Sequence, residues 1–262
     1  MKLSISNIAW SSNNEETYYK ILQTSGVEGL EIAPTKIFGT DAYAHLSEAK
    51  EWSKKIKTKY SLNISSMQSI WYGRQEAMFT DAEARKKLFA YTQKAIDFAE
   101  AISCPNLVFG CPKNRKRAGK NVGEVAKDFF SKLGEYAYQH GTVIAMEANP
   151  TIYDTDYINT TDEAFALVKE LSSQGFMVNL DFGTIIANKE NLNSISENLD
   201  LINHIHISEP YLGIIKERKE HIELKNILKQ KNYSKYVSIE MKTCENKQTI
   251  IDVIQYIKGV FE

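Results

Sequence analysis

Short apolar runs recur along the chain and alternate with longer stretches of mixed apolar and polar residues. The runs cover residues 3–8, 29–32, 63–68, 106–109, 143–147, 177–181, 203–207 and 236–240. Each holds four to six residues, many of them β-branched or aromatic, between turn-forming residues. Continuous apolar runs of this length are typical of parallel strands that are buried on both faces. We therefore predict eight buried parallel strands.

The stretch at residues 82–102 carries an apolar side chain at every third or fourth position, as on one face of a helix. This stripe consists of Leu88, Tyr91, Ala95, Phe98, Ala99 and Ile102. Thr80 and Glu83, at its start, match the capping-box pattern in which two side chains bond reciprocally to the first backbone groups of a helix. We predict a helix over residues 82–102 that begins with this box.

A second capping-box pattern, Thr160 with Glu163, precedes the amphipathic residues 164–171. Gly175 follows them and is expected to end this helix. Residues 186–200 are less periodic, and we also expect a helix there.

Eight strand–helix units in 262 residues give about 33 residues per unit, which suits an α/β fold of the (β/α)8 TIM-barrel type. A doubly wound open sheet is the alternative, but it usually carries a glycine-rich phosphate loop after its first strand. Residues 7–12 contain no glycine. We therefore predict a single TIM-barrel domain over residues 1–262, with its active site at the carboxyl ends of the strands.

Composition narrows the class of protein further. The chain has 32 basic and 33 acidic residues, a balance that argues against nucleic-acid binding through a basic surface. No apolar run approaches the roughly 18 residues of a membrane span, and the start of the sequence does not resemble a secretory signal. Three cysteines without a CxxC pair predict no disulfide framework. We expect a cytoplasmic protein with neither a nucleic-acid nor a membrane partner.

Four consecutive strand ends carry residues with metal-ligating side chains: Glu147, Asp181, His206 and Glu240. A carboxylate in an apolar strand is costly to bury unless it is paired or bound to a metal. Each residue taken alone could pair with a nearby Lys or Arg, but carboxylates that converge on one barrel mouth repel one another unless a cation lies between them. Three carboxylates and one imidazole suit Mn, Mg, Co or Zn, and we predict such a divalent metal.

Several of these strand ends form recognisable motifs in a fixed order. They are GLEI at 29–32, AMEAN at 145–149, NLDFGT at 179–184, HIHISE at 204–209 and SIEMK at 238–242. Through them the whole chain resembles the xylose isomerase-like TIM-barrel superfamily, which includes sugar phosphate isomerases and epimerases, tagatose 3-epimerase, hydroxypyruvate isomerase and endonuclease IV. The resemblance implies that Glu147, Asp181, His206 and Glu240 bind the metal. It also implies a small-molecule sugar substrate and assembly as a homodimer or homotetramer.

The sequence departs from the epimerases of this superfamily at two positions. These enzymes usually carry a histidine three residues after the metal-binding aspartate, where this chain has Thr184, and an arginine about six residues after the metal-binding histidine, where it has Leu212. We therefore expect a substrate other than the usual free ketohexose. Lys216 or Arg218 could take the place of the missing arginine.

The resemblance and the residue types together predict proton transfer beside a carbonyl group through a cis-enediolate. Glu147 and Glu240 are the expected acid/base pair, one removing the proton and the other returning it. Return to the same carbon gives epimerisation and return to the neighbouring carbon gives aldose–ketose isomerisation, and the sequence leaves both open. We predict a divalent-metal-dependent isomerase or epimerase of a sugar or sugar derivative.

Three other functions are alternatives. A lyase or dehydratase acting on a sugar or polyol could use the same chemistry. An endonuclease IV-like repair enzyme needs further histidines for a three-zinc cluster, and Ser69, Cys111 and Thr184 stand near those places. A ligand-binding barrel without catalysis has little need of a metal site with paired carboxylates.

Further residues at the strand ends are candidates for substrate contact. They are Trp10, Gln68, Trp71, Lys113, Arg115, Asn149, Glu209 and His221. Lys113 and Arg115 belong to a basic loop that could hold a phosphate or carboxylate, or could simply be solvated. The two tryptophans could line a sugar pocket or pack in the barrel rim. His221 could touch substrate or cap a helix at the surface.

Overall fold

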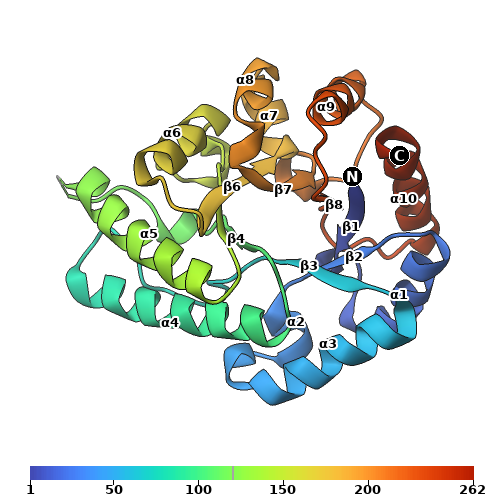
Figure 1. Ribbon diagram of the computed structural model, residues 1–262, viewed down its shortest axis with the longest axis horizontal. Coiled ribbons are helices and arrows are strands. Elements are labelled where there is room, and N and C mark those ends of the chain that lie inside the picture. Colours follow the sequence, from blue (N-terminus) through green and yellow to red (C-terminus); the bar gives the residue numbers. More distant parts are fainter. Residues whose placement is uncertain (120) are drawn as a thin grey trace.

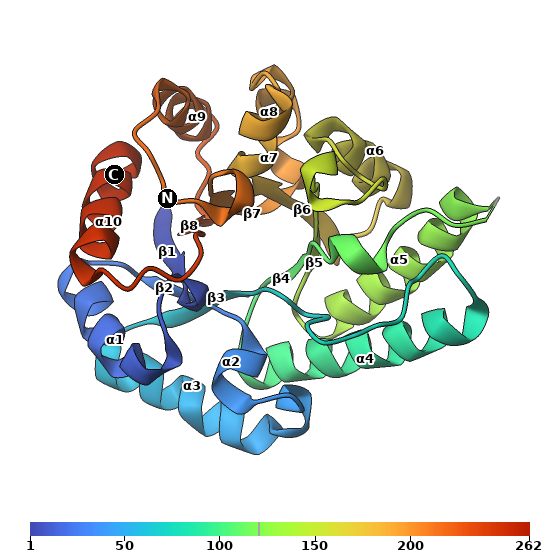
Figure 2. The same ribbon diagram turned by 180° about the vertical axis from the view of Figure 1, so that it is seen from behind.

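The structure is a computed structural model that describes residues 1–119 and 121–262; Lys120 of the basic loop lies outside them. Its described strands form a closed barrel in the order β1 to β8, and every neighbouring pair is parallel. Helices surround this central ring (Figure 1), and Figure 2 shows the same ring from behind. The predicted (β/α)8 barrel is thereby confirmed, and a closed barrel excludes the open doubly wound sheet.

Each predicted apolar run coincides with one strand, with ends that differ by no more than two residues. The strands are β1 (Lys2–Ser6), β2 (Gly29–Ile32), β3 (Asn63–Met67), β4 (Leu107–Phe109), β5 (Ile144–Glu147), β6 (Phe176–Asp181), β7 (Ile202–Ile207) and β8 (Tyr236–Ile239). The first run is longer than its strand because Asn7–Ala9 turns into a short 3-10 helix. Glu240 lies one residue beyond β8.

The barrel closes where β1 pairs with both β2 and β8. Ile5 stands opposite Leu30 on one side and Ile239 on the other. At Gly29 a Cβ atom would lie 2.7 Å from Cε1 of Tyr236 and 2.8 Å from Cβ of Ser4, so the backbone approaches too closely for any other residue. The first and the last strands are therefore joined in one sheet without an open edge.

The helices pack their apolar faces on the outside of the barrel. They are α1 (Glu15–Thr24), α2 (Pro34–Phe38), α3 (Leu46–Tyr60), α4 (Ala82–Ala101), α5 (Val122–Gln139), α6 (Thr161–Leu171), α7 (Phe182–Asn188), α8 (Asn193–Glu197), α9 (Lys219–Gln230) and α10 (Lys247–Phe261). Within the described residues, none of these helices combines the length and the apolar character needed to cross a membrane.

The capping box at α6 is confirmed: the Thr160 hydroxyl accepts from the Glu163 amide, and the Glu163 carboxylate accepts from the Thr160 amide, both at 3.2 Å. The box predicted for Thr80 and Glu83 is wrong. Asp81 is the N-cap of α4, and its carboxylate accepts from the Ala84 amide at 2.7 Å, because an ionised side chain one residue further on is the stronger acceptor.

Two further predictions about helices are wrong. Helix α6 ends at Leu171, but the left-handed residue that caps it is Ser172, with φ 48°, and not Gly175. Gly175 instead packs against α5, where a Cβ atom would lie 2.0 Å from the Gly134 carbonyl oxygen. Residues 186–200 do not form one helix, since α7 starts earlier, at Phe182, and α8 is separate.

Polar side chains fill part of the barrel interior. Ser4 and Ser65 share a hydrogen bond of 2.6 Å across β1 and β3. Gln68 donates to Ser6 at 2.6 Å and to Glu31 on β2 at 3.2 Å. All of these groups are buried. Ser6, Gln68 and Glu31 form one connected polar network near the carboxyl ends of the strands.

Candidate functional site

The four predicted metal ligands come together at the carboxyl ends of the last four strands. Glu147 ends β5, Asp181 ends β6, His206 lies near the end of β7, and Glu240 follows β8. The strand register places Asp181 directly beside His206. Each of the four offers one ligand atom, and these atoms all lie within 4.8 Å of one another. We call these residues the acidic quartet.

The spacing of the quartet atoms fits a divalent cation. In an octahedral site with bonds of about 2.1 Å, neighbouring ligand atoms lie about 3.0 Å apart and opposite ones about 4.2 Å apart. Nδ1 of His206 lies 3.0 Å from Oε1 of Glu147 and 3.2 Å from Oε2 of Glu240. Oxygen and imidazole donors at this spacing suit Mn²⁺, Mg²⁺, Co²⁺ or Zn²⁺.

The electrostatics of the quartet also favour a bound cation. Burial raises the pKa of Glu240 to about 7; the His206 ring acts to lower it, while the carboxylates of Glu147 and Asp181 add to the rise. Burial and then the charge of Glu147 raise the pKa of Asp181 to about 6. A positive ion among these side chains would offset both the lost solvation and the mutual repulsion.

Neutral donors hold Asp181 in place. Its Oδ2 accepts hydrogen bonds from the Thr184 amide at 2.7 Å and the Thr184 hydroxyl at 2.8 Å, and its Oδ1 accepts from the Ser208 hydroxyl. Asp181 is at the same time the N-cap of α7. Thr184, which replaces the histidine of the epimerases, thus supports Asp181 from within the first turn of that helix.

Glu147 is held by two side-chain amides. Asn149 donates to its Oε2 at 3.0 Å, and Asn179 donates to its Oε1 at 2.7 Å. The backbone after β4 approaches the same carboxylate, because a Cβ atom at Gly110 would lie 2.7 Å from Glu147 Oε2. Any larger residue at position 110 would displace the glutamate.

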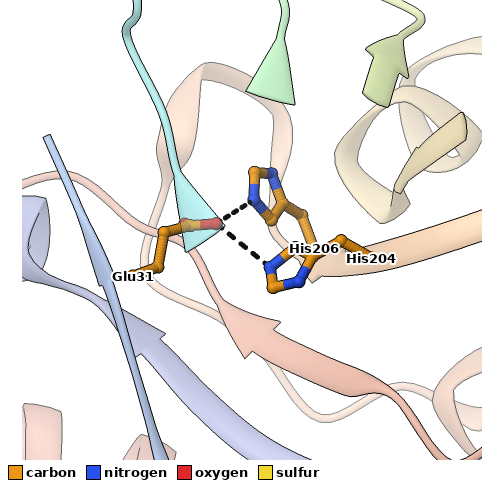
Figure 3. Close-up of side chains that lie close together, drawn as sticks. All are labelled: Glu31, His204 and His206. Atoms are coloured by element: carbon orange, nitrogen blue, oxygen red, sulfur yellow. Dashed lines mark hydrogen bonds and ion pairs between the residues drawn. The ribbon is translucent and has the colours of Figure 1, made fainter. Parts of the chain in front are cut away.

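Glu31 is a buried charged residue that was not among the predicted site residues. Its Oε2 accepts from Nε2 of His206 at 2.8 Å, and Nε2 of His204 lies 3.0 Å from the same oxygen (Figure 3). Burial alone would raise the pKa of Glu31, but His206 and His204 outweigh it and hold the pKa well below its ordinary value. Its one signal in the sequence is a carboxylate inside the apolar run 29–32.

Arg115 is hydrogen-bonded within the protein, and its contact with an anionic substrate stays a prediction. Its side chain is fully buried, and its Nη2 donates to the Glu147 carbonyl at 2.9 Å and to Oδ1 of Asn149 at 2.8 Å. The guanidinium therefore joins the loop after β4 to the end of β5. Lys113 is exposed and lines a cavity of about 450 Å³ together with Ser69 and Tyr72.

The two predicted tryptophans and Gln68 are buried and bonded within the protein. Nε1 of Trp10 donates to Glu15 at 3.1 Å, and Nε1 of Trp71 donates to Thr92 at 2.8 Å. Gln68 is occupied by Ser6 and Glu31, as described above. These contacts match the packing alternative considered for the tryptophans, and a substrate contact for any of the three stays a prediction.

Nε and Nη2 of Arg218 donate to the two carboxylate oxygens of Glu209, at 2.7 and 2.6 Å. Arg218 is thus paired within the protein, whereas Lys216 is exposed. His221 is fully buried, and its Nδ1 lies 2.9 Å from the Tyr256 hydroxyl. The alternative of a surface histidine that caps a helix is therefore wrong, because α10 covers the ring.

Tyr153, in the loop after β5, was not predicted as a site residue. Its hydroxyl accepts from the Tyr211 amide at 2.8 Å, so the loops after β5 and β7 are joined on either side of β6. Burial raises the pKa of Tyr153 to about 12; the bond from Tyr211 acts to lower it, and the charge of Asp181 acts to raise it. A phenol therefore lies within electrostatic range of the quartet.

Comparisons with known proteins agree with this fold. A family model described as xylose isomerase-like TIM barrel matches residues 19–259. A sequence comparison with curated proteins finds no match.

Solved structures of similar fold include a 3-keto-D-glucoside 4-epimerase from Escherichia coli, 18% identical, with a TM-score of 0.79 over 99% of both chains. They also include a D-psicose 3-epimerase from Clostridium cellulolyticum, 14% identical, with a TM-score of 0.82 over 100% of both chains. A sugar phosphate isomerase/epimerase from Parabacteroides distasonis is 14% identical, with a TM-score of 0.73 over 98% of this chain and 92% of its own. At such low identity these similarities establish the fold alone.

Proposed function

The chain belongs to the xylose isomerase-like TIM-barrel family, and on this premise we propose that it is a divalent-metal-dependent isomerase or epimerase of a sugar or sugar derivative. The acidic quartet carries the proposal, because its four ligand atoms lie within 4.8 Å of one another at the carboxyl ends of β5 to β8. Active sites of TIM barrels lie at this end of the strands.

Glu147, Asp181, His206 and Glu240 would hold the cation. A divalent cation bound there would stabilise negative charge that develops on adjacent oxygens of the substrate. Asn149 and Asn179 keep the Glu147 carboxylate oriented, and Thr184 and Ser208 do the same for Asp181. The protein thus provides a rigid set of oxygen donors at one edge of the barrel.

Proton transfer is assigned to Glu147 and Glu240. They lie at the carboxyl ends of strands that are three positions apart around the barrel, so they can approach a substrate carbon from different sides. One carboxylate would remove the proton beside the carbonyl, and the other would return a proton to the same or the neighbouring carbon.

Lys113 is the candidate contact for an anionic part of the substrate. It is exposed at the cavity beside the loop after β4, and no described residue forms an ion pair with it. The backbone of the same loop approaches the Glu147 carboxylate at Gly110. A phosphorylated or otherwise acidic sugar is the substrate class that a contact with Lys113 would favour.

Hydrogen–deuterium exchange tests the proposal. The protein loaded with Mn²⁺ is incubated in heavy water with a panel of free and phosphorylated sugars, and deuterium at the carbon beside the carbonyl is followed by NMR. We expect incorporation into at least one sugar. Glu147→Gln and Glu240→Gln should each lower turnover by about 10²–10⁴-fold, the usual contribution of acid/base groups.

Glu51→Gln, at an exposed position on α3, is the matched control and should turn over like the wild type. Turnover retained in the double variant Glu147→Gln/Glu240→Gln would exclude the proposed mechanism. An absence of exchange with every sugar would remove the proposed function itself.

A further inference from the structure

His206 lies between two groups of carboxylates. Its Nδ1 faces the quartet, at 3.0 Å from Glu147 and 3.2 Å from Glu240. Its Nε2 faces the opposite way, toward Glu31 on β2, at 2.8 Å. The ring is fully buried, so neither nitrogen is open to bulk water.

The hydrogen bond to Glu31 determines which nitrogen carries the hydrogen. An ionised carboxylate only accepts hydrogen bonds, so Nε2 must be the donor. An imidazole that ligates a metal is neutral and has one N–H group, and therefore Nδ1 keeps a lone pair, which the Asn179 amide nitrogen also approaches at 3.2 Å. We propose that Glu31 fixes the tautomer of His206 and so makes Nδ1 the nitrogen offered to the cation. The inference rests on the proposed metal site, and it assigns Glu31 as a positioning residue.

Glu31 is itself held firmly enough for this role. Gln68 donates to its Oε1 at 3.2 Å and is fixed in turn by Ser6 at 2.6 Å. Nε2 of His204 is 3.0 Å from Oε2 but is not aligned for a hydrogen bond, so the aligned ring donor is that of His206. A carboxylate behind a ligating imidazole is the usual means of orienting the ring and raising its basicity.

Glu31, His204 and His206 also form a group with metal-ligating atoms, all within 4.8 Å of one another. A second ion there would need the lone pair of Nε2 while the quartet uses that of Nδ1, so His206 would have to lose both ring hydrogens. The hydrogen-bonded arrangement needs no such ionisation. We therefore assign one cation per chain, at the quartet.

The variant Glu31→Gln tests the tautomer directly. A glutamine side chain has only one oxygen to accept hydrogen bonds, whereas Glu31 accepts from Gln68 with Oε1 and from His206 with Oε2. If that oxygen faces Gln68, the amide NH₂ faces His206, and Nε2 must then accept while the hydrogen moves to Nδ1. The hydrogen on Nδ1 would compete with the cation. In the double variant Glu31→Gln/Gln68→Glu, the new carboxylate at position 68 accepts from the amide NH₂ group at position 31. The amide oxygen at position 31 then faces His206 again and accepts from Nε2, so Nδ1 is free of the hydrogen.

Mn²⁺ affinity and stoichiometry, measured by electron paramagnetic resonance titration, are the first readout. We expect about 10- to 100-fold weaker binding in Glu31→Gln, the usual effect of losing a partner of a ligating histidine. Binding should recover in Glu31→Gln/Gln68→Glu. Ser4→Ala is the matched control: it changes a buried polar side chain of the barrel interior that is hydrogen-bonded to Ser65, and the Mn²⁺ affinity of this variant should not change.

Nitrogen NMR of the Mg²⁺-loaded protein labelled at histidine is the second readout. In the wild type the His206 hydrogen should reside on Nε2, and in Glu31→Gln it should not. Unchanged Mn²⁺ affinity in Glu31→Gln, a hydrogen on Nδ1 in the wild type, or a second Mn²⁺ per chain that depends on Glu31 would each overturn the inference. A wild type that binds one Mn²⁺ with this tautomer but turns over no sugar would remove the proposed function and leave the role of Glu31 intact.

Discussion

Arg115 is a charged side chain with no exposed surface, and its Nη2 donates hydrogen bonds to oxygens beside the quartet. Removal of a buried donor leaves its acceptors without partners, at about 1–3 kcal/mol for each. We expect Arg115→Met to lower the free energy of unfolding by about 2–4 kcal/mol, as measured by urea denaturation followed through tryptophan fluorescence.

Lys113→Met provides the control for Arg115→Met, since it removes an exposed cation from the same loop. Exposed substitutions usually change the free energy of unfolding by no more than about 0.5 kcal/mol. Equal unfolding free energies for the two variants would contradict a structural role for Arg115.

At the scale of the elements, His221 on α9 is buried between Phe182 of α7 and Tyr256 of α10. Burial lowers the pKa of His221 to about 4; Glu209 acts to raise it and Arg218 to lower it further. Its Nε2 has no hydrogen-bond partner among the described residues, so a proton added there would be unsatisfied.

The packing of these three helices should therefore depend on pH. The folded-state pKa lies below the ordinary value of 6.5, so the unfolded chain binds the proton first as the pH falls. This contribution to stability is complete above pH 6.5 and is lost toward pH 4. Between pH 7.5 and pH 5 the free energy of unfolding should fall by about 2 kcal/mol more in the wild type than in His221→Gln.

Chemical denaturation at the two pH values gives this difference, and His45→Gln, at an exposed ring on the surface, should behave like the wild type. If wild type and His221→Gln lose the same stability on acidification, His221 is not the group responsible.

At the scale of the whole molecule, the quartet joins the last four strands of the closed sheet. A ligand that binds only the folded state stabilises it, by about 2.7 kcal/mol at a concentration one hundred times its Kd. We expect Mn²⁺ to raise the melting temperature of the chelator-treated protein. The double variant Glu147→Gln/Glu240→Gln should lose this shift.

Differential scanning calorimetry with and without Mn²⁺ measures the effect. A wild type whose melting temperature stays at its chelated value in saturating Mn²⁺ would show that the quartet does not hold the ion in the folded state.

Local sequence was sufficient to predict the eight strands and the convergence of the quartet. Apolar runs mark buried parallel strands, and parallel strands of a barrel all end at one edge, so residues at those ends must meet once the barrel closes. The capping box of α6 was predictable for a similar reason, because Thr160 and Glu163 act within one helical turn. In each case the interacting groups are related by position along the chain.

Tertiary structure alone decided the partners of the buried charges. Glu31 and His206 lie on β2 and β7, which are not neighbours in the sheet, and they meet because their side chains point into the same closed interior. Arg115 looked like a loop cation, yet the loop folds inward to bond at the end of β5. Such contacts depend on which surfaces barrel closure and helix packing bring together, and no periodicity along the sequence records them.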